Sequence, residues 1–263
     1  MPTEVVLVGH GRLGSAMAAW LRQPPTIVRH RDWPRFLQHV GARRPALVIF
    51  AIPDDAIEPA GRELAAARAD WRGSTVLHTS GAVPSTALAG LRRRGAVVAA
   101  MHPMMTFPPR QKPPSKGVLV TLEGDPAACR RAAALVRGWK AVPMVLTARQ
   151  KAAYHLTATL VGPGAVAQFA AAERILKLSG LSPTQFALAR NGLFQLLSAT
   201  ARNLQHGTAE AWTGPLARGD SATVARHWEL LPASLRAFYA SLVDISLSLL
   251  PSPHAAAVRR KIR

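Results

Sequence analysis

Two basic side chains, Lys151 and His155, stand four residues apart in the stretch "KAAYH". On a helix this spacing puts both of them on one face. A lysine or a histidine held there can give a proton to a developing alkoxide or amine, and the lysine charge also stabilises the oxyanion before the transfer. We therefore predict a catalytic site that includes Lys151 and His155. On spacing alone, a surface lysine beside a packed histidine explains the pair equally well.

Two further polar stretches follow apolar runs of strand length. "LHTSGA" contains His78 and Ser80, and "AMHPMM" contains His102. Because the carboxyl ends of parallel strands meet at one edge of a sheet, we expect these stretches to face one crevice together with "AIPDD". We assign His102 to the catalytic site and expect Ser80 to hydrogen-bond a substrate or a cofactor. A histidine after a strand is a structural hydrogen-bonding residue as often as a catalytic one, so the structural alternative stays open.

A glycine-rich loop precedes the first helical pattern and indicates a dinucleotide. It follows the apolar run Val5–Val8. In such a context Gly9 permits a tight turn, Gly11 lets the backbone approach a pyrophosphate, and Gly14 lets the helix pack closely on the strand. The helix N-terminus then supplies N–H donors and a partial positive charge. The predicted cofactor-binding residues of the loop are Gly9, His10, Gly11, Arg12, Leu13 and Gly14.

The end of the second strand indicates which dinucleotide binds. NAD enzymes usually carry Asp or Glu there, whereas this chain has Arg29, His30 and Arg31, with Asp32 following late. A carboxylate repels a 2′-phosphate, while guanidinium groups pair with it, so we predict NADP(H). Solvated charges at a strand end are the alternative explanation. Predicted cofactor contacts from the neighbouring strand ends are Ile52, Pro53 and Thr79.

Apolar runs of strand length alternate with helical patterns over the first half of the chain. This alternation predicts an α/β fold with a doubly wound, Rossmann-type parallel sheet over residues 1–149. From residue 150 the pattern is mainly helical, apart from "TGPLARGD" at 213–220, and predicts a substrate and dimerisation domain over 150–263. The proline-rich segment 108–117 predicts a loop, since proline fits neither a helix interior nor a central strand.

Composition and charge narrow the functional classes. The chain has 263 residues, 49% of them apolar, which is typical of a globular protein. Its net charge is +19, yet the basic residues are scattered and aromatics make up only 6%. This pattern argues against a specific nucleic-acid site and favours a small anionic substrate. Cys129 is the only cysteine, so we expect neither a disulfide framework nor a metal site, and we expect a buried thiol there.

Apolar runs stay well short of the roughly 20 residues that a membrane-spanning helix needs. The N-terminus carries Glu4 and lacks the basic region of a signal peptide. We therefore expect a cytoplasmic protein without a membrane segment.

The whole chain resembles a family of uncharacterised Rossmann-like oxidoreductases with a helical C-terminal domain of unknown function. The resemblance rests on the glycine loop, "IPDDAI", "HTSGA", "HPMMTF", "KAAYH" and, most specifically, "TGPLARGD". The wider superfamily includes β-hydroxyacid dehydrogenases, ketopantoate reductases, pyrroline-5-carboxylate reductases and prephenate dehydrogenases. The resemblance also implies a homodimer formed through the helical domain.

Individual residues match these relatives unequally. Lys151 matches the catalytic lysine of the β-hydroxyacid dehydrogenases, and His155 takes the place of the asparagine that follows it there. His102 resembles the histidine of the His-Pro-Met motif in prephenate dehydrogenases. The closest family usually has an asparagine about two turns after the Tyr-His pair, where this chain has Gly162-Pro163-Gly164. This departure puts the substrate specificity and the level of activity in question.

Together these features imply an NADP(H)-dependent oxidoreductase. It would reduce the carbonyl or imine of a small carboxylate-bearing substrate, with ketopantoate as the first candidate. A non-catalytic NADP-binding sensor or partner protein is the main alternative, and a basic nucleic-acid-associated protein is the third.

Overall fold

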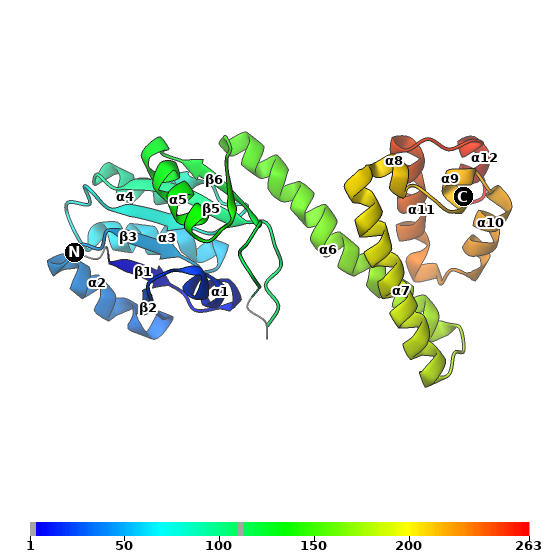
Figure 1. Cartoon of the computed structure of the whole chain (residues 1–263), viewed down its shortest axis with the longest axis horizontal. Helices are drawn as coiled ribbons and strands as arrows, with labels where there is room; N and C mark the ends of the chain where they lie inside the picture. The colour runs from blue at the N-terminus through cyan, green and yellow to red at the C-terminus, as the bar shows by residue number, and fades with distance from the viewer. Residues whose placement is uncertain (1–3, 110–112, 263) are drawn as a thin grey trace. The chain divides into compact units, whose positions relative to one another are not determined.

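The structure is a computed structural model that describes residues 4–109 and 113–262 (Figure 1). The chain forms two compact units, Met1–Gly162 and Pro163–Arg263. The predicted loop at 108–117 lies partly outside the described residues, at positions 110–112. The units divide inside the long helix α6 (Ala148–Leu178), whose start is close to the predicted domain boundary at residue 149. That boundary stays a prediction.

The first unit is built on a seven-stranded sheet in the order β2-β1-β3-β4-β5-β6-β7. The strands are β1 (Val5–Val8), β2 (Thr26–Val28), β3 (Leu47–Phe50), β4 (Thr75–His78), β5 (Val97–Pro103), β6 (Leu119–Gly124) and β7 (Val142–Val145). The first five strands pair in parallel, with β1 at the point where the strand order reverses. The predicted fold class, a doubly wound sheet followed by a helical region, is confirmed.

The sheet departs from the prediction at one pair of strands. β5 and β6 run antiparallel, with His102 opposite Thr121. Parallel neighbours need a crossover connection, usually a helix. The described parts of the connection, residues 104–109 and 113–118, contain no helix, so the chain turns back directly. The prediction of a wholly parallel sheet was therefore wrong for this pair, while β6 and β7 are again parallel.

Helices cover both faces of the sheet, because successive strand side chains point to opposite sides. One core contains Val6 and Val8 together with side chains of α2 (Trp33–Ala42), α3 (Asp54–Ala66) and α4 (Ala89–Arg93). The other core contains Leu7 together with side chains of α1 (Arg12–Trp20) and α5 (Pro126–Gly138). Cys129 belongs to this second core and is 4% exposed, as predicted for a buried thiol. Both faces of the sheet are therefore closed, and its carboxyl edge is where a site can open.

The second unit is helical throughout its ordered elements. After α6 come α7 (Pro183–Asn203), α8 (Thr208–Ala211), α9 (Pro215–Arg218), α10 (Ser221–Leu230), α11 (Ala233–Leu249) and α12 (Ala255–Arg259). Ser182 caps α7 by accepting a hydrogen bond from the Gln185 N–H at 3.3 Å. A small core joins Val224 of α10, Val243 of α11 and Val258 of α12. Figure 1 shows α10 and α12 close to the C-terminus. The segment "TGPLARGD" interrupts the helical pattern on both sides of α9, as predicted, although its four central residues form that short helix.

Candidate functional site

The glycine loop between β1 and α1 has the geometry that its sequence predicted. Gly9 has a φ of +98°, and a Cβ placed there would lie 2.2 Å from the Ala51 carbonyl oxygen. A Cβ on Gly14 would lie 2.4 Å from the Gly9 carbonyl oxygen, so the glycine allows α1 to approach the loop. A Cβ on Gly11 would meet no described protein atom within 4 Å. Gly11 thus leaves open space beside the N-terminus of α1, where a phosphate can be held by backbone N–H groups.

A cleft of about 740 Å³ opens beside this loop. The ends of β1 and β2 form one wall, and α3 forms another through Ala56, Pro59, Ala60 and Glu63. Arg29 and His30 line the β2 end of the cleft and are exposed. A guanidinium group and an imidazole at the end of the second strand suit the 2′-phosphate of NADP better than the bare hydroxyl of NAD.

The cleft gathers seven of the predicted cofactor residues and leaves five outside its lining. Those that line it are Gly9, His10, Gly11, Arg29, His30, Ile52 and Pro53. Those that do not are Arg12, Leu13, Gly14, Arg31 and Thr79. The first three lie in the first turn of α1, next to the loop.

Arg31 and Thr79 have other partners. The Arg31 side chain is 76% exposed and lies 3.7 Å from an Asp32 carboxylate oxygen. The Thr79 hydroxyl is buried and donates to the Phe50 carbonyl oxygen at 3.1 Å. Of the pair Arg29 and Arg31, therefore, only Arg29 lines the cleft, and the cofactor contacts of both stay predictions.

Sequence reasoning missed the α3 wall and a contact across the cleft. The Trp33 indole N–H donates to a Glu63 carboxylate oxygen at 2.6 Å, and both residues line the cleft. The spacing of Ala56, Ala60 and Glu63 puts them on one helical face. These residues begin within "IPDDAI", so their helical spacing could have predicted that this face of α3 lines the site.

Two histidines predicted for catalysis lie together at the carboxyl edge of the sheet. The rings of His102, on β5, and His155, on α6, meet edge to face with centroids 5.5 Å apart and an interplanar angle of 80°. Burial, the neighbouring His155 and Lys151 lower the pKa of His102 to about 4. Among the described residues, the His102 Nδ1 is buried without a hydrogen-bond partner.

Gly81, which follows β4, is packed against both rings. A Cβ on Gly81 would lie 2.2 Å from His155 Cδ2 and 2.9 Å from His102 Nε2. The sequence contained Gly81 in "HTSGA", yet nothing in its spacing indicated a contact with residues of β5 and α6.

Lys151 is buried beneath the turn formed by residues 80–83. Its side chain is 2% exposed, and its Nζ donates a hydrogen bond to the Val83 carbonyl oxygen. Burial lowers the pKa of Lys151, while the charges of Glu123 and Asp54 oppose this shift. Glu123 is itself buried and accepts hydrogen bonds from the Ser85 N–H and the Ser85 hydroxyl, both at 2.8 Å.

Ser80 and His78 belong to the structural part of the site. The Ser80 hydroxyl oxygen accepts hydrogen bonds from the Ala82 N–H at 3.1 Å and the Val83 N–H at 2.9 Å, which closes the turn. The His78 ring is fully buried, with Nε2 3.3 Å from the Pro84 carbonyl oxygen. Burial and the nearby Lys151 lower the pKa of His78 to about 4. The expected contact of Ser80 with a substrate stays a prediction.

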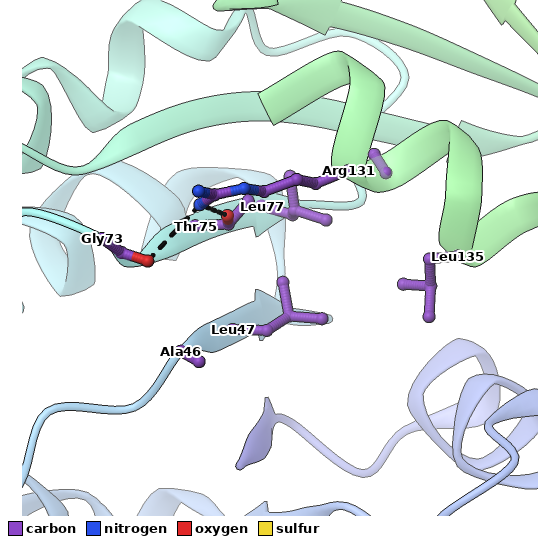
Figure 2. Close-up of a pocket in the computed structure, with 8 residues that line it drawn as sticks. Ala46, Leu47, Gly73, Thr75, Leu77, Arg131 and Leu135 are labelled. Atoms are coloured by element: carbon purple, nitrogen blue, oxygen red, sulfur yellow. Dashed lines mark hydrogen bonds between the residues drawn. The ribbon is translucent and has the colours of Figure 1, made fainter. Parts of the chain in front are cut away.

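A second cavity lies at the opposite edge of the sheet, near the amino ends of β3 and β4 (Figure 2). It has a volume of about 310 Å³ and is lined mostly by apolar side chains such as Leu47, Leu77 and Leu135. Its one charged lining residue, Arg131, donates a hydrogen bond to the Thr75 hydroxyl at 2.8 Å, as Figure 2 shows. Ligands of open α/β sheets bind at the carboxyl ends of the strands, so this cavity is a packing feature between α5 and the sheet.

Family models match two parts of the chain. A Rossmann-like domain matches residues 26–103, and a domain of unknown function, DUF2520, matches residues 118–245. The chain joins a Rossmann-like domain to a DUF2520 domain. This confirms the pairing that the sequence resemblance implied. The DUF2520 match includes Lys151 and His155, whereas the glycine loop precedes both matches.

Solved structures share the fold over nearly the whole chain. A protein from Thermotoga maritima is 21% identical, with a TM-score of 0.67, and the match covers 98% of this chain and 100% of that one. A Bacteroides fragilis protein, provisionally named an NADP oxidoreductase, is 18% identical, with a TM-score of 0.71 and 98% coverage of both chains. A reductive aminase from Aspergillus terreus in complex with NADPH and ethyl-5-oxohexanoate is 18% identical, with a TM-score of 0.63 and 99% coverage of both. At these identities the likeness concerns the fold.

No curated protein matches the DUF2520-containing chain in sequence. Over residues 4–109 and 113–262, no helix combines the length and apolar character needed to cross a membrane. The same residues contain no group of three or more His, Cys, Asp or Glu side chains arranged to hold a metal ion.

Proposed function

We propose that this protein is an NADP(H)-dependent oxidoreductase that reduces the carbonyl or imine of a small carboxylate-bearing substrate. One observation carries the proposal: the cleft beside the glycine loop opens at the same sheet edge that holds Lys151, His102 and His155. The bound NADPH of the Aspergillus terreus reductive aminase and the name of the Bacteroides fragilis protein support the cofactor and the reaction class.

The residues of the cleft fit an NADP molecule. Gly11 leaves space for the pyrophosphate, and α1 has no acidic residue in its first turn to repel it. Arg29 and His30 supply positive or donor groups for the 2′-phosphate, and the α3 wall offers an apolar surface for the adenine. When bound, NADPH supplies a hydride. The chain must then orient the substrate, exclude water and give a proton to the developing oxyanion or amine, for which Lys151, His102 and His155 are the candidates.

The net charge of the chain is our reason for proposing a carboxylate-bearing substrate. The chain carries a net charge of +19, which attracts a carboxylate-bearing molecule towards the site. Ketopantoate stays the first named candidate, and small cyclic imines that carry a carboxylate join it because an imine reductase from Aspergillus terreus shares the fold.

NADPH oxidation at 340 nm, followed across a panel of 2-oxo acids and cyclic imines, tests the proposal. We expect at least one panel member to be reduced with NADPH and more slowly with NADH. Tight NADP binding without any turnover would instead favour the alternative of a non-catalytic NADP-binding protein. A steep dependence of DNA affinity on salt, without NADP binding, would favour the nucleic-acid alternative.

We also propose that the protein works as a homodimer through its helical region. None of the 21 residues of α7 is buried in the single chain, although the helix carries large apolar side chains. Leu188, Phe194 and Leu196 are each at least 60% exposed. Helices in proteins gain most of their stability from packing an apolar face. A second copy of the chain is the partner that would cover this face.

A further inference from the structure

The strongest constraint on the proton donor comes from the surroundings of Lys151. Its side chain is 2% exposed, and its Nζ is hydrogen-bonded to the Val83 carbonyl oxygen. The Ser80 hydroxyl oxygen accepts from the Ala82 and Val83 N–H groups of the same turn. Lys151 and Ser80 therefore both hold the main chain at residues 80–83, and one donor of the Lys151 ammonium group is used in this contact.

The same turn carries Gly81, which touches the two imidazoles. A Cβ on Gly81 would come within 2.2 Å of His155 and 2.9 Å of His102, so the backbone of the turn sets how close the two rings can lie. Both histidines are partly exposed, in contrast to Lys151. A proton can reach them from solvent, and a substrate can approach them.

We propose that His155 gives the proton in the reduction and that Lys151 is a positioning residue, which acts by holding the 80–83 turn, and with it Gly81, against the His102–His155 pair. The inference rests on the proposed reductase function. In the step, a hydride adds to the carbon of the C=O or C=N group, whose π bond breaks. The oxygen or nitrogen takes a proton from the ring of His155, which regains one from the solvent. NADPH is oxidised and the substrate is reduced.

Electrostatics argues against His102 as the acid. The pKa of His102 is lowered to about 4, so this ring is neutral near pH 7 and has no acidic proton to give. His102 faces His155 from β5, Lys151 lies one turn back on α6, and Asp54 at the start of α3 acts on both His102 and Lys151. A neutral His102 suits a hydrogen bond to the substrate, which leaves His155 as the partly exposed ring of the pair that can act as the donor.

The test compares three variants of the full-length protein: His155→Gln, Lys151→Met and, as the control, Lys177→Met on the same helix, where the lysine is exposed. NADPH oxidation is measured with ketopantoate and with 1-pyrroline-2-carboxylate, and NADPH affinity by calorimetry. We expect His155→Gln to lower the rate by about 10²- to 10⁴-fold, as for loss of a general acid, with NADPH affinity retained. Lys151→Met should lower the rate less than His155→Gln, and Lys177→Met should match the wild type. A Lys151→Met variant that loses more activity than His155→Gln would overturn the proposal.

A readout that needs no substrate tests the positioning role. Titration of the imidazole ¹⁵N resonances of the NADPH-bound protein should show the pKa of His102 rising in Lys151→Met, because a nearby positive charge is lost. The signals of both rings should also shift in Gly81→Ala, because the added methyl group displaces His155. If Lys151→Met leaves the titration and shifts of both rings unchanged, the positioning role is rejected.

The activity of the wild type distinguishes failure of the proposed reductase function from failure of the inference about His155. If the wild type reduces neither compound, the donor role of His155 is rejected along with the proposed reductase activity on these substrates, while the titration still decides the role of Lys151. If the wild type is active and His155→Gln is equally active, the inference alone fails.

Discussion

Arg29 and Arg31 are two residues apart, yet only Arg29 lines the cleft beside the glycine loop. We expect Arg29→Ala to weaken NADP binding about tenfold to a hundredfold, since one charged hydrogen bond contributes roughly 1.5–3 kcal/mol. Arg31→Ala is the matched control and should change the affinity little, because its side chain is 76% exposed and paired with Asp32. Calorimetric titration with NADP and NAD measures both effects. Equal losses in the two variants would contradict the placement of Arg31 outside the site.

His78 makes the stability of the first unit depend on pH. Its pKa is lowered to about 4 in the folded protein, against about 6.5 in an unfolded chain. The unfolded state therefore binds more protons between these two pH values, and stability is lost as the pH falls from about 6.5 to 4. The shift corresponds to about 3 kcal/mol.

Replacing the ring tests this dependence. His78→Gln keeps a donor for the Pro84 carbonyl oxygen but does not titrate, so its free energy of unfolding should fall less steeply with acidification. Urea unfolding between pH 7 and pH 4 measures the slope. His39→Gln, at an exposed position on α2, should retain the slope of the wild type. An unchanged slope in His78→Gln would show that His78 does not cause the acid sensitivity.

At the scale of elements, the loop between β1 and α1 separates the roles of two glycines. Gly11 has a φ of −72° and open space around it, so Gly11→Val should fold normally and lose NADP binding, because the side chain fills the pyrophosphate position. Gly14→Ala should lower the melting temperature, since its Cβ would lie 2.4 Å from the Gly9 carbonyl oxygen. Circular dichroism and calorimetric NADP titration distinguish the two effects. A Gly11→Val variant that folds and binds NADP normally would show that the loop is only structural.

The sequence predicted those parts of the fold that depend on local pattern. β1 begins and ends where its apolar run predicted, because the strand is largely buried and Gly9 follows it. The antiparallel direction of β6 was not predicted, because it depends on how the chain returns from β5. The break in "TGPLARGD" was predicted, but the four-residue helix inside it was not, because it fits between two glycines with positive φ, Gly214 and Gly219.

In the candidate site, too, local sequence patterns predicted some features and missed others. The positions of His102 and Lys151 at the sheet edge followed from strand ends and helix spacing. The contacts of Gly81 with two rings and of Lys151 with Val83 join segments far apart in the chain, so no local pattern contained them. The proposed positioning role of Lys151 rests on these long-range contacts.

At the scale of the whole molecule, the exposed apolar face of α7 predicts how the protein assembles. Phe194→Glu should convert a dimer to a monomer of about 28 kDa, because a charge cannot be buried in the contact without a partner. Gln38→Glu, which adds the same charge at an exposed site on α2, should leave the dimer intact. Sedimentation velocity at micromolar concentration measures both. A wild-type protein that sediments as a monomer would reject the proposed homodimer.

Cys129 has a practical consequence for spectroscopy. It is the only cysteine, it is 4% exposed, and burial together with Glu123 and Asp125 raises its pKa to about 11. Thiol reagents attack through the thiolate, so this sulfur is protected from them in the folded protein. A cysteine introduced at exposed Arg31 would accordingly take up a maleimide fluorophore selectively, without removal of the native thiol. Such a label lies next in sequence to His30, which lines the cleft, and can turn nucleotide binding into an optical signal.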